Sequence, residues 1–239
     1  MDKLFRVLLT LISRGILVTV CIPAACYAKA WVSDALGDKT PKHEGRMSLD
    51  FRKHLDFYGV LITMVLGFGW SKEMNHDISQ LKNMKRDLTF ISLTQSVAYF
   101  LMYVILRNLS GAIFGLAPAS FLLACIYRIL SKTGYSCLCF GVIALLPIPP
   151  LDGFHIFYQF SWPKFRRWYF TNYQKIMYWS RYVLLGIFFL DSITDGEFSI
   201  LDPLIDMWTW VWDHLVFFDV DWSKVTLKTL KYVFGFKGL

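Results

Sequence analysis

A single carboxylate follows a proline-rich break in an apolar part of the chain. Residues 145–153 read Leu-Leu-Pro-Ile-Pro-Pro-Leu-Asp-Gly, which places Asp152 and Gly153 directly after the break. The prolines are Pro147, Pro149 and Pro150. Proline lacks the backbone N–H and clashes with the preceding helical turn, so a helix that enters this stretch ends there. A carboxylate beside a broken helix at membrane depth marks a candidate functional site. The alternative is that Asp152 caps the next helix.

Four short motifs precede this stretch along the chain. They read Gly37-Asp38-Lys39-Thr40, Gly45-Arg46-Met47-Ser48-Leu49, His54-Leu55-Asp56-Phe57-Tyr58-Gly59 and Gly69-Trp70-Ser71-Lys72. Together with the proline-rich stretch, their order and spacing resemble the short-form members of the site-2 protease family, the intramembrane zinc metalloproteases. The resemblance covers nearly the whole chain. It implies that Asp152 stands at the position of the family's third zinc ligand.

The resemblance also locates what the chain lacks. Counting back from Gly37 places the family's H-E-x-x-H motif at residues 25–29. Ala25 stands in place of the first histidine, Cys26 in place of the glutamate and Lys29 in place of the second histidine. Two histidines four residues apart share one helix face and hold zinc, while the glutamate activates the bound water. Alanine cannot bind zinc, and lysine brings a cation to the place of a dication. The resemblance therefore implies a degenerate motif, with no catalytic residue and no zinc cofactor.

The residues that support the zinc site in the family are replaced as well. Residues 94–99 stand where the family has A-G-P-x-x-N and keep none of its marked residues, and Ala144 replaces an asparagine. The scaffold motifs are kept, so we expect one group of residues to retain groove or structural roles. These are Lys29, Gly37, Asp38, His54, Asp56, Pro147, Pro149, Pro150, Asp152 and Gly153.

The residues of the degenerate site allow three arrangements. A buried cation needs an opposite charge, so Lys29 and Asp152 are expected to form an ion pair in the emptied metal site. The second arrangement is a rebuilt metal site of Cys26, His54 and Asp152, which needs three ligands to converge by replacement. In the third, the charge of Lys29, one helical turn away, stabilises a thiolate on Cys26 and makes it a nucleophile.

The composition predicts that this site lies in a membrane protein. The 239 residues are 55% hydrophobic and 18% charged, with a mean hydropathy of +0.42. Soluble domains carry about 25% charged residues. Several apolar stretches reach spanning length, which predicts an all-α polytopic membrane protein with one domain. The net charge of +7 is typical of cytoplasmic loops, and the basic and aromatic pattern of a nucleic-acid module is missing from the sequence.

Apolar runs predict a bundle of about five transmembrane helices. They cover residues 15–36, 88–106, 118–148, 176–191 and 198–218. Residues 1–14 are expected to form an amphipathic lead-in. A signal peptide is the competing interpretation of this end, because Ala28-Lys29-Ala30 resembles a cleavage site.

Two of the apolar segments depart from a simple span. Residues 55–70 are short and contain three glycines, which suits a re-entrant or β-like membrane-dipping element. Residues 118–148 are too long for one straight span, and the polar residues 131–134 interrupt them. We expect one broken helix that delivers Asp152 to the site, with a tight hairpin as the alternative.

The charges predict how the bundle is oriented. Loops 37–54, 71–87 and 158–175 are basic, as is the tail 219–239, whereas turn 191–202 is acidic. Basic loops stay in the cytoplasm, so we expect a cytoplasmic C-terminus and an N-terminus on the other side. Residues 1–218 then form a single membrane domain, and the tail is cytoplasmic.

These patterns predict a pseudoprotease: an inactive homologue that holds a transmembrane segment or a partner subunit. Its environment is the lipid bilayer, and no nucleic-acid partner is expected. One alternative is an active zinc metalloprotease with a rebuilt site. The other is a purely structural subunit of a membrane complex.

Overall fold

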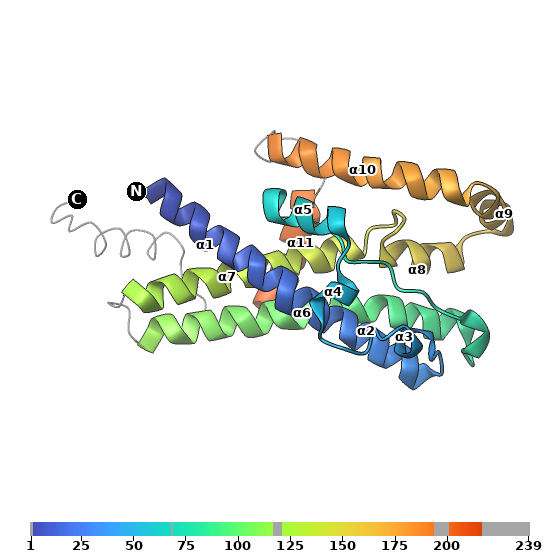
Figure 1. The fold of residues 1–239 in the computed structure, drawn as a ribbon, viewed down its shortest axis with the longest axis horizontal. Helices are drawn as coiled ribbons and strands as arrows, with labels where there is room; N and C mark the ends of the chain where they lie inside the picture. Colours follow the sequence, from blue (N-terminus) through green and yellow to red (C-terminus); the bar gives the residue numbers. More distant parts are fainter. Residues whose placement is uncertain (1, 68, 117–120, 194–200, 217–239) are drawn as a thin grey trace.

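The computed structural model describes residues 2–67, 69–116, 121–193 and 201–216, and within these ranges all regular elements are helices (Figure 1). This confirms the predicted all-α class for the described residues. The elements are α1 (Asp2–Ile16), the π-helical turn η1 (Leu17–Cys21), α2 (Ile22–Leu36), α3 (Thr40–His43), α4 (Phe51–His54), α5 (Phe57–Leu66), the 3₁₀ turn η2 (Ile78–Gln80), α6 (Met84–Leu116), α7 (Phe121–Ala144), α8 (Asp152–Phe160), α9 (Pro163–Thr171), α10 (Tyr173–Ile193) and α11 (Leu201–Asp213).

The N-terminal lead-in and the first predicted span form one helical run. Within the stretch Leu4–Leu36 an 18-residue window has a mean hydropathy of 2.0, and the stretch is long and apolar enough to cross a membrane. The π-helical turn η1 ends at Cys21, two residues before Pro23. Because proline cannot donate to the carbonyl four residues earlier, a wider turn at this point lets the helix continue without a break.

Helices α6 and α7 pack along one another and share the most extensive helix–helix contact of the described residues. The stretch Met84–Ile113 is the second described helix that is long and apolar enough to span, and it extends beyond the predicted 88–106. The interruption predicted at residues 131–134 is wrong, because α7 is continuous there. Its hydroxyls are paired inside the bundle: Ser131 Oγ lies 2.9 Å from Ser110 Oγ, and Thr133 Oγ1 donates to Ile129 O. Such bonds satisfy small polar side chains within helices.

The helix break falls at the proline-rich stretch. Helix α7 ends at Ala144, and α8 begins at Asp152 after a turn that contains a cis peptide bond between Pro149 and Pro150. The N-cap residue of α8 is Leu151, so the Asp152 carboxylate does not serve as the cap. A broken helix therefore delivers Asp152 to the interior, as predicted.

Gly153 is required by the tightness of this turn. A Cβ added to Gly153 would lie 2.0 Å from the carbonyl oxygen of Leu145, which is a backbone atom and cannot rotate away. Gly153→Ala is therefore expected to lower the free energy of unfolding by about 1–3 kcal/mol. Thermal denaturation in detergent measures this loss.

Gly186→Ala is the matched control, because an added Cβ there meets nothing within 4 Å. In the interior of α10 the same substitution is expected to be neutral or to stabilise the helix by about 0.5–1 kcal/mol. Equal melting temperatures for the two variants would contradict the predicted clash.

The two ends of the short segment 55–71, which follows the second motif, lie side by side. Asp56 caps α5 by accepting a 2.9 Å hydrogen bond from the Gly59 N–H, and Gly67 ends the helix at φ +92°. Leu55 and Ser71 form an isolated antiparallel bridge that ties the two ends together. A helix of 10 residues is about 15 Å long, half the thickness of a bilayer's hydrocarbon core. Helix α5 is therefore too short to cross a membrane.

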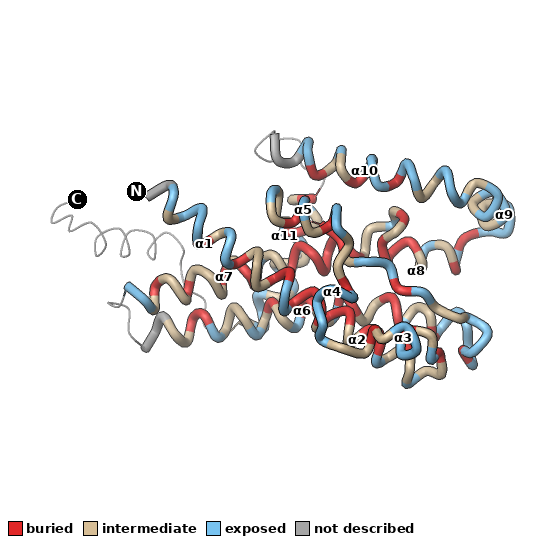
Figure 2. Tube along the Cα trace, viewed as in Figure 1, coloured by how far each residue is buried: buried red, intermediate tan, exposed pale blue. Residues whose placement is uncertain are grey.

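The C-terminal helices are partly described. Helix α10 covers the predicted span 176–191, and α11 covers the central part of the predicted span 198–218. The tail 219–239 and most of the turn 191–202 lie outside the described residues. Helices α9 and α10 are largely exposed, whereas the buried residues concentrate where α2, α6 and α7 meet (Figure 2).

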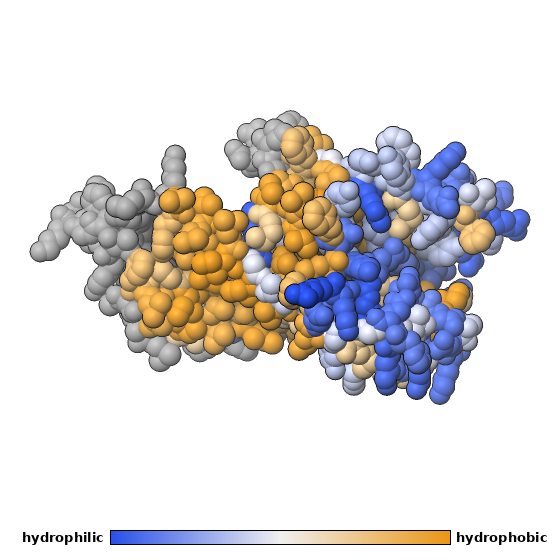
Figure 3. Space-filling view, in the orientation of Figure 1, coloured by the Kyte–Doolittle hydropathy of each residue, from blue (hydrophilic) through white to orange (hydrophobic). Residues whose placement is uncertain are grey.

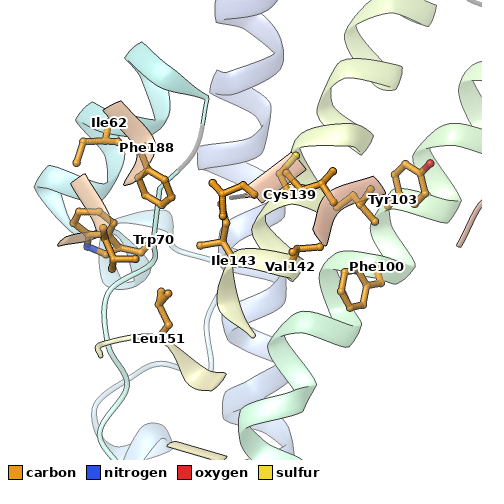
Figure 4. Packing of buried hydrophobic residues seen from close by; sticks show 13 residues of the cluster. Ile62, Trp70, Phe100, Tyr103, Cys139, Val142, Ile143, Leu151 and Phe188 are labelled. Atoms are coloured by element: carbon orange, nitrogen blue, oxygen red, sulfur yellow. The ribbon is translucent and has the colours of Figure 1, made fainter. Parts of the chain in front are cut away.

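Two clusters of buried side chains hold the elements together. One joins α6, α7, α10 and α11 and includes Trp70 and Leu151 (Figure 4). Within it Phe100 stacks on Trp208 with ring centroids 4.8 Å apart. The other cluster joins α2 to α6 and α7 and includes Ala25 and Cys26. Because Leu151 is part of the core, packing fixes the position of the residue that follows it.

The surface divides into two halves along the long axis. Side chains over α1 and the neighbouring parts of α6 and α7 are mainly apolar, and the half that carries α3, α8 and α9 is mainly polar (Figure 3). The N-terminus of α1 lies at the apolar end, while α3 and α9 lie at the polar end (Figure 1). Three of the predicted basic loops, 37–54, 71–87 and 158–175, therefore approach the same end of the molecule.

Candidate functional site

A buried ion pair occupies the centre of the candidate site. Lys29 Nζ, from the middle of α2, donates to Asp152 Oδ1 at the start of α8. Lys29 is 4% exposed and Asp152 is 7% exposed. Removing two charges from water is unfavourable, and their attraction compensates only when both groups stay paired. The predicted ion pair is thus present, and each of the two residues supplies the charge that neutralises the other.

The space beside this pair is small. A cavity of about 30 Å³ is lined by the pair and by further polar side chains, those of Ser71, Lys72, Glu73, Gln95 and Tyr99. Gln95 Nε2 donates to Ser71 Oγ over 2.9 Å. One water molecule needs about 10–15 Å³ of such volume. The cavity has room for one or two water molecules and is far too small for a peptide.

The other two positions of the degenerate motif lie on the same helix. Ala25 is fully buried and stands four residues before Lys29, so the two residues share a helix face. Cys26 is 1% exposed. A thiol with so little access behaves as a packing residue rather than as a nucleophile.

The residues of the rebuilt metal site are not brought together. Across the described ranges no group of three or more His, Cys, Asp or Glu side chains is placed to hold a metal ion, which includes the set Cys26, His54 and Asp152. His54 Nε2 instead lies 2.7 Å from Ser48 O. A catalytic zinc ion needs three protein ligands. Since Lys29 already neutralises Asp152, the residues present here do not fit zinc.

The scaffold residues build the turn that follows α2. Gly37 ends α2 at φ +113°, and a Cβ there would lie 2.9 Å from Gln80 O. Asp38 is fully buried, and its carboxylate accepts hydrogen bonds from Ser33 Oγ at 2.9 Å and from the Thr40 N–H at 3.0 Å. This turn holds the C-terminal end of the helix that carries Lys29.

Two further residues of this network were not predicted. His76 Nδ1 lies 3.0 Å from Asp38 Oδ2. Arg46 is 4% exposed and donates to Lys53 O and, over 2.6 Å, to Glu73 O. Arg46 belongs to one of the recognised motifs, so a signal for it was available. His76 lies outside every motif, and only the folded chain brings it to Asp38.

The environment of His76 predicts a dependence of stability on pH. Burial and the charge of Lys29 lower the pKa of His76 from 6.5 to about 4, and they outweigh the contact with Asp38, which raises it. The unfolded chain therefore binds more protons than the folded chain between these values. The stability is complete above about pH 6.5 and is expected to fall by about 3 kcal/mol as the pH drops toward 4.

Denaturation at a series of pH values measures this loss. His76→Gln should flatten the curve between pH 6.5 and 4, while His43→Gln, at an exposed histidine on α3, should leave the slope unchanged. A slope that survives in His76→Gln would show that other groups cause it.

Comparison with known proteins gives one distant relationship. Over 132 residues the chain is 30% identical to a protein of Bacillus subtilis (strain 168) named "Putative zinc metalloprotease YwhC". The similarity covers 54% of this chain and 60% of that protein, so the chain spans less than two thirds of the relative's length. No protein-family profile matches the chain, and no solved structure matches it. The scaffold is thus distantly related to that of a metalloprotease-like protein.

Proposed function

We propose that the chain is a catalytically inactive homologue of the site-2 protease family that acts in a membrane as a binding or assembly protein. The observation that carries this proposal is the buried ion pair of Lys29 and Asp152. In the family, the position of Lys29 belongs to a zinc-binding histidine. Here the chain supplies its own cation to the remaining carboxylate, so the charge of the former metal site is balanced without a metal.

The surroundings of the pair support a role without hydrolysis. Peptide hydrolysis by a zinc ion requires three ligands, a bound water and access for the substrate. The cavity of about 30 Å³ beside Asp152 offers no such access, and Cys26 replaces the carboxylate base. A homologue in this state can still hold a transmembrane segment or a partner subunit with the rest of its scaffold.

We also propose a multi-pass arrangement of about five spans, with α5 as a re-entrant element. The two long apolar helices and the division of the surface into an apolar and a polar half support this arrangement. Because the basic loops approach the polar end, the positive-inside rule assigns that end to the cytoplasm. The tail 219–239 lies outside the described residues, and its own basic charge is the reason to propose the cytoplasmic side for it.

Zinc content tests the loss of the metal site. Protein purified, exposed to zinc and dialysed is expected to retain far less than one zinc ion per chain and to show no zinc-dependent peptide hydrolysis. The reason is that Lys29 occupies Asp152 and repels a second cation. Elemental analysis by mass spectrometry gives the metal content.

The competing function is an active zinc metalloprotease with a rebuilt site, and the name of the B. subtilis relative favours it. Stoichiometric zinc that disappears in Asp152→Ala, with the fold unharmed, would establish that function and overturn the proposal. His43→Gln removes an exposed histidine and reports zinc bound adventitiously at the surface.

A further inference from the structure

A second cavity, separate from the ion pair, gathers positive charge in the apolar half of the molecule. It has a volume of about 580 Å³ and is lined by residues of α1, α6, α7 and α11 together with the end of α5. Its charged lining residues are Arg14, Arg107, Lys132 and Asp213. Three cations thus face one carboxylate, which leaves an excess of positive charge in the cavity.

Two of these cations are held by neutral groups. Arg14 Nη1 donates to Met64 O over 2.7 Å and to Val65 O over 2.9 Å, at the C-terminal end of α5. Lys132 Nζ donates to Thr10 Oγ1. Neither Arg14 nor Lys132 takes part in an ion pair with another described residue. These bonds satisfy some of the donors and leave both charges without a counterion among the described residues.

The carboxylate of the cavity is already engaged. Asp213 accepts a hydrogen bond from the hydroxyl of Tyr103, a buried residue of α6. One carboxylate cannot neutralise three cations, whichever of them lies closest to it. The cavity is therefore complementary to an additional anionic group.

Two of the cations lie within helices that could span a membrane. Arg14 belongs to the candidate span Leu4–Leu36, and Arg107 belongs to the candidate span Met84–Ile113. Exposed apolar side chains flank them on both sides, namely Leu11 and Val20 on α1 and Ile105 and Leu109 on α6. Figure 3 shows a narrow polar break in the apolar surface beside α5. Charges at such a depth are costly and mark functional sites unless they are paired.

We propose that this cavity docks a transmembrane segment that carries a carboxylate within its apolar stretch. The inference rests on the proposed binding role and names the chemistry of the partner: an Asp or Glu side chain that enters between α1 and α5. A lipid phosphate stays at headgroup level, and a neutral helix would leave Arg14 and Lys132 uncompensated. A carboxylate on a helix reaches the depth of the cations and balances the excess charge.

Binding of designed helices tests this inference. The full chain is reconstituted in phosphatidylcholine nanodiscs with fluorescent peptides of about 20 apolar residues that carry one central Glu, Gln or Lys. Energy transfer measures the affinity. The Glu peptide is expected to bind about tenfold more tightly than the Gln peptide, and the Lys peptide should bind least.

Variants of the chain identify the cavity as the cause of the preference. Arg14→Gln and Lys132→Gln, which keep donors for the existing hydrogen bonds, should each reduce the advantage of the Glu peptide, while Arg14→Lys should preserve it. Arg6→Gln is the control, because Arg6 is exposed on α1 and does not line the cavity.

The outcomes separate this inference from the proposed function. Equal affinity for the Glu and Gln peptides would overturn the inference that the cavity recognises a carboxylate. The proposed loss of zinc chemistry would be unaffected, because the metal content tests it separately. A preference that survives Lys132→Gln in a folded protein would overturn the assignment to this cavity. Displacement of the Glu peptide by phosphatidylglycerol would mean that a lipid anion is the ligand, and it would also overturn the inference.

Discussion

Asp152→Ala is expected to lower the free energy of unfolding by about 3–5 kcal/mol, because it leaves the ammonium group of Lys29 buried without a counterion. The loss should appear in stability or assembly rather than in an enzymatic activity. Denaturation of the purified protein in detergent measures it. Most single substitutions in proteins lower stability by only about 0.5–3 kcal/mol, so a loss of this size points to a stranded charge.

A double substitution supplies the control. Replacing both members of a buried pair by apolar residues of similar volume is often neutral or stabilising. Lys29→Met combined with Asp152→Leu should therefore recover most of the stability that Asp152→Ala loses. If the single and the double variants are equally unstable, the loss comes from packing at the turn and the ion pair is not its cause.

The combination of Ala25→His with Lys29→His is expected to create a zinc site where the wild type has none. Lys29 already faces Asp152, and residue 25 lies on the same face of α2, so two histidines there would join the carboxylate as three ligands. Removal of the lysine also removes the cation that repels the metal. Elemental analysis should find about one zinc ion per chain, because three protein ligands are enough to hold zinc in a catalytic site.

The position of the first histidine provides a strict control. Ala24→His with Lys29→His changes the same number of residues, but successive side chains of a helix point about 100° apart, so the ligands no longer converge. This variant should bind little zinc. Equal zinc in both variants would show that the metal is held at the surface, and no zinc in either would contradict the proposed relation between α2 and α8.

Several features of the site could be predicted because they depend on local chemistry. Three prolines end a helix wherever they occur, and the type of residue at position 29 determines that Asp152 meets a cation instead of a histidine. The all-α class follows from apolar runs of sufficient length. The pairing of residues 29 and 152 could be predicted only from the resemblance to a family, because the residue spacing within each of the two segments says nothing about the other segment.

Other features depend on partners that lie far away in the sequence. Ser131 and Thr133 look like an interruption of α7, yet hydroxyls on α6 and α1 lie within hydrogen-bond distance of them and the helix continues. His76 meets Asp38 only after α6 and the preceding loop have packed. The cavity cations Arg14, Arg107 and Lys132 come from three different helices, and each cation alone resembles a residue at the end of a span.

The ion pair has a consequence for how this sequence can change over time. Lys29 and Asp152 are 123 positions apart, yet a substitution at either one strands the other in a buried place. A histidine at position 29 alone would leave Asp152 with neither a lysine nor a complete set of metal ligands. Selection would therefore remove most single replacements at these two positions. In a collection of relatives, residues 29 and 152 are expected to covary, with lysine and aspartate lost or kept together.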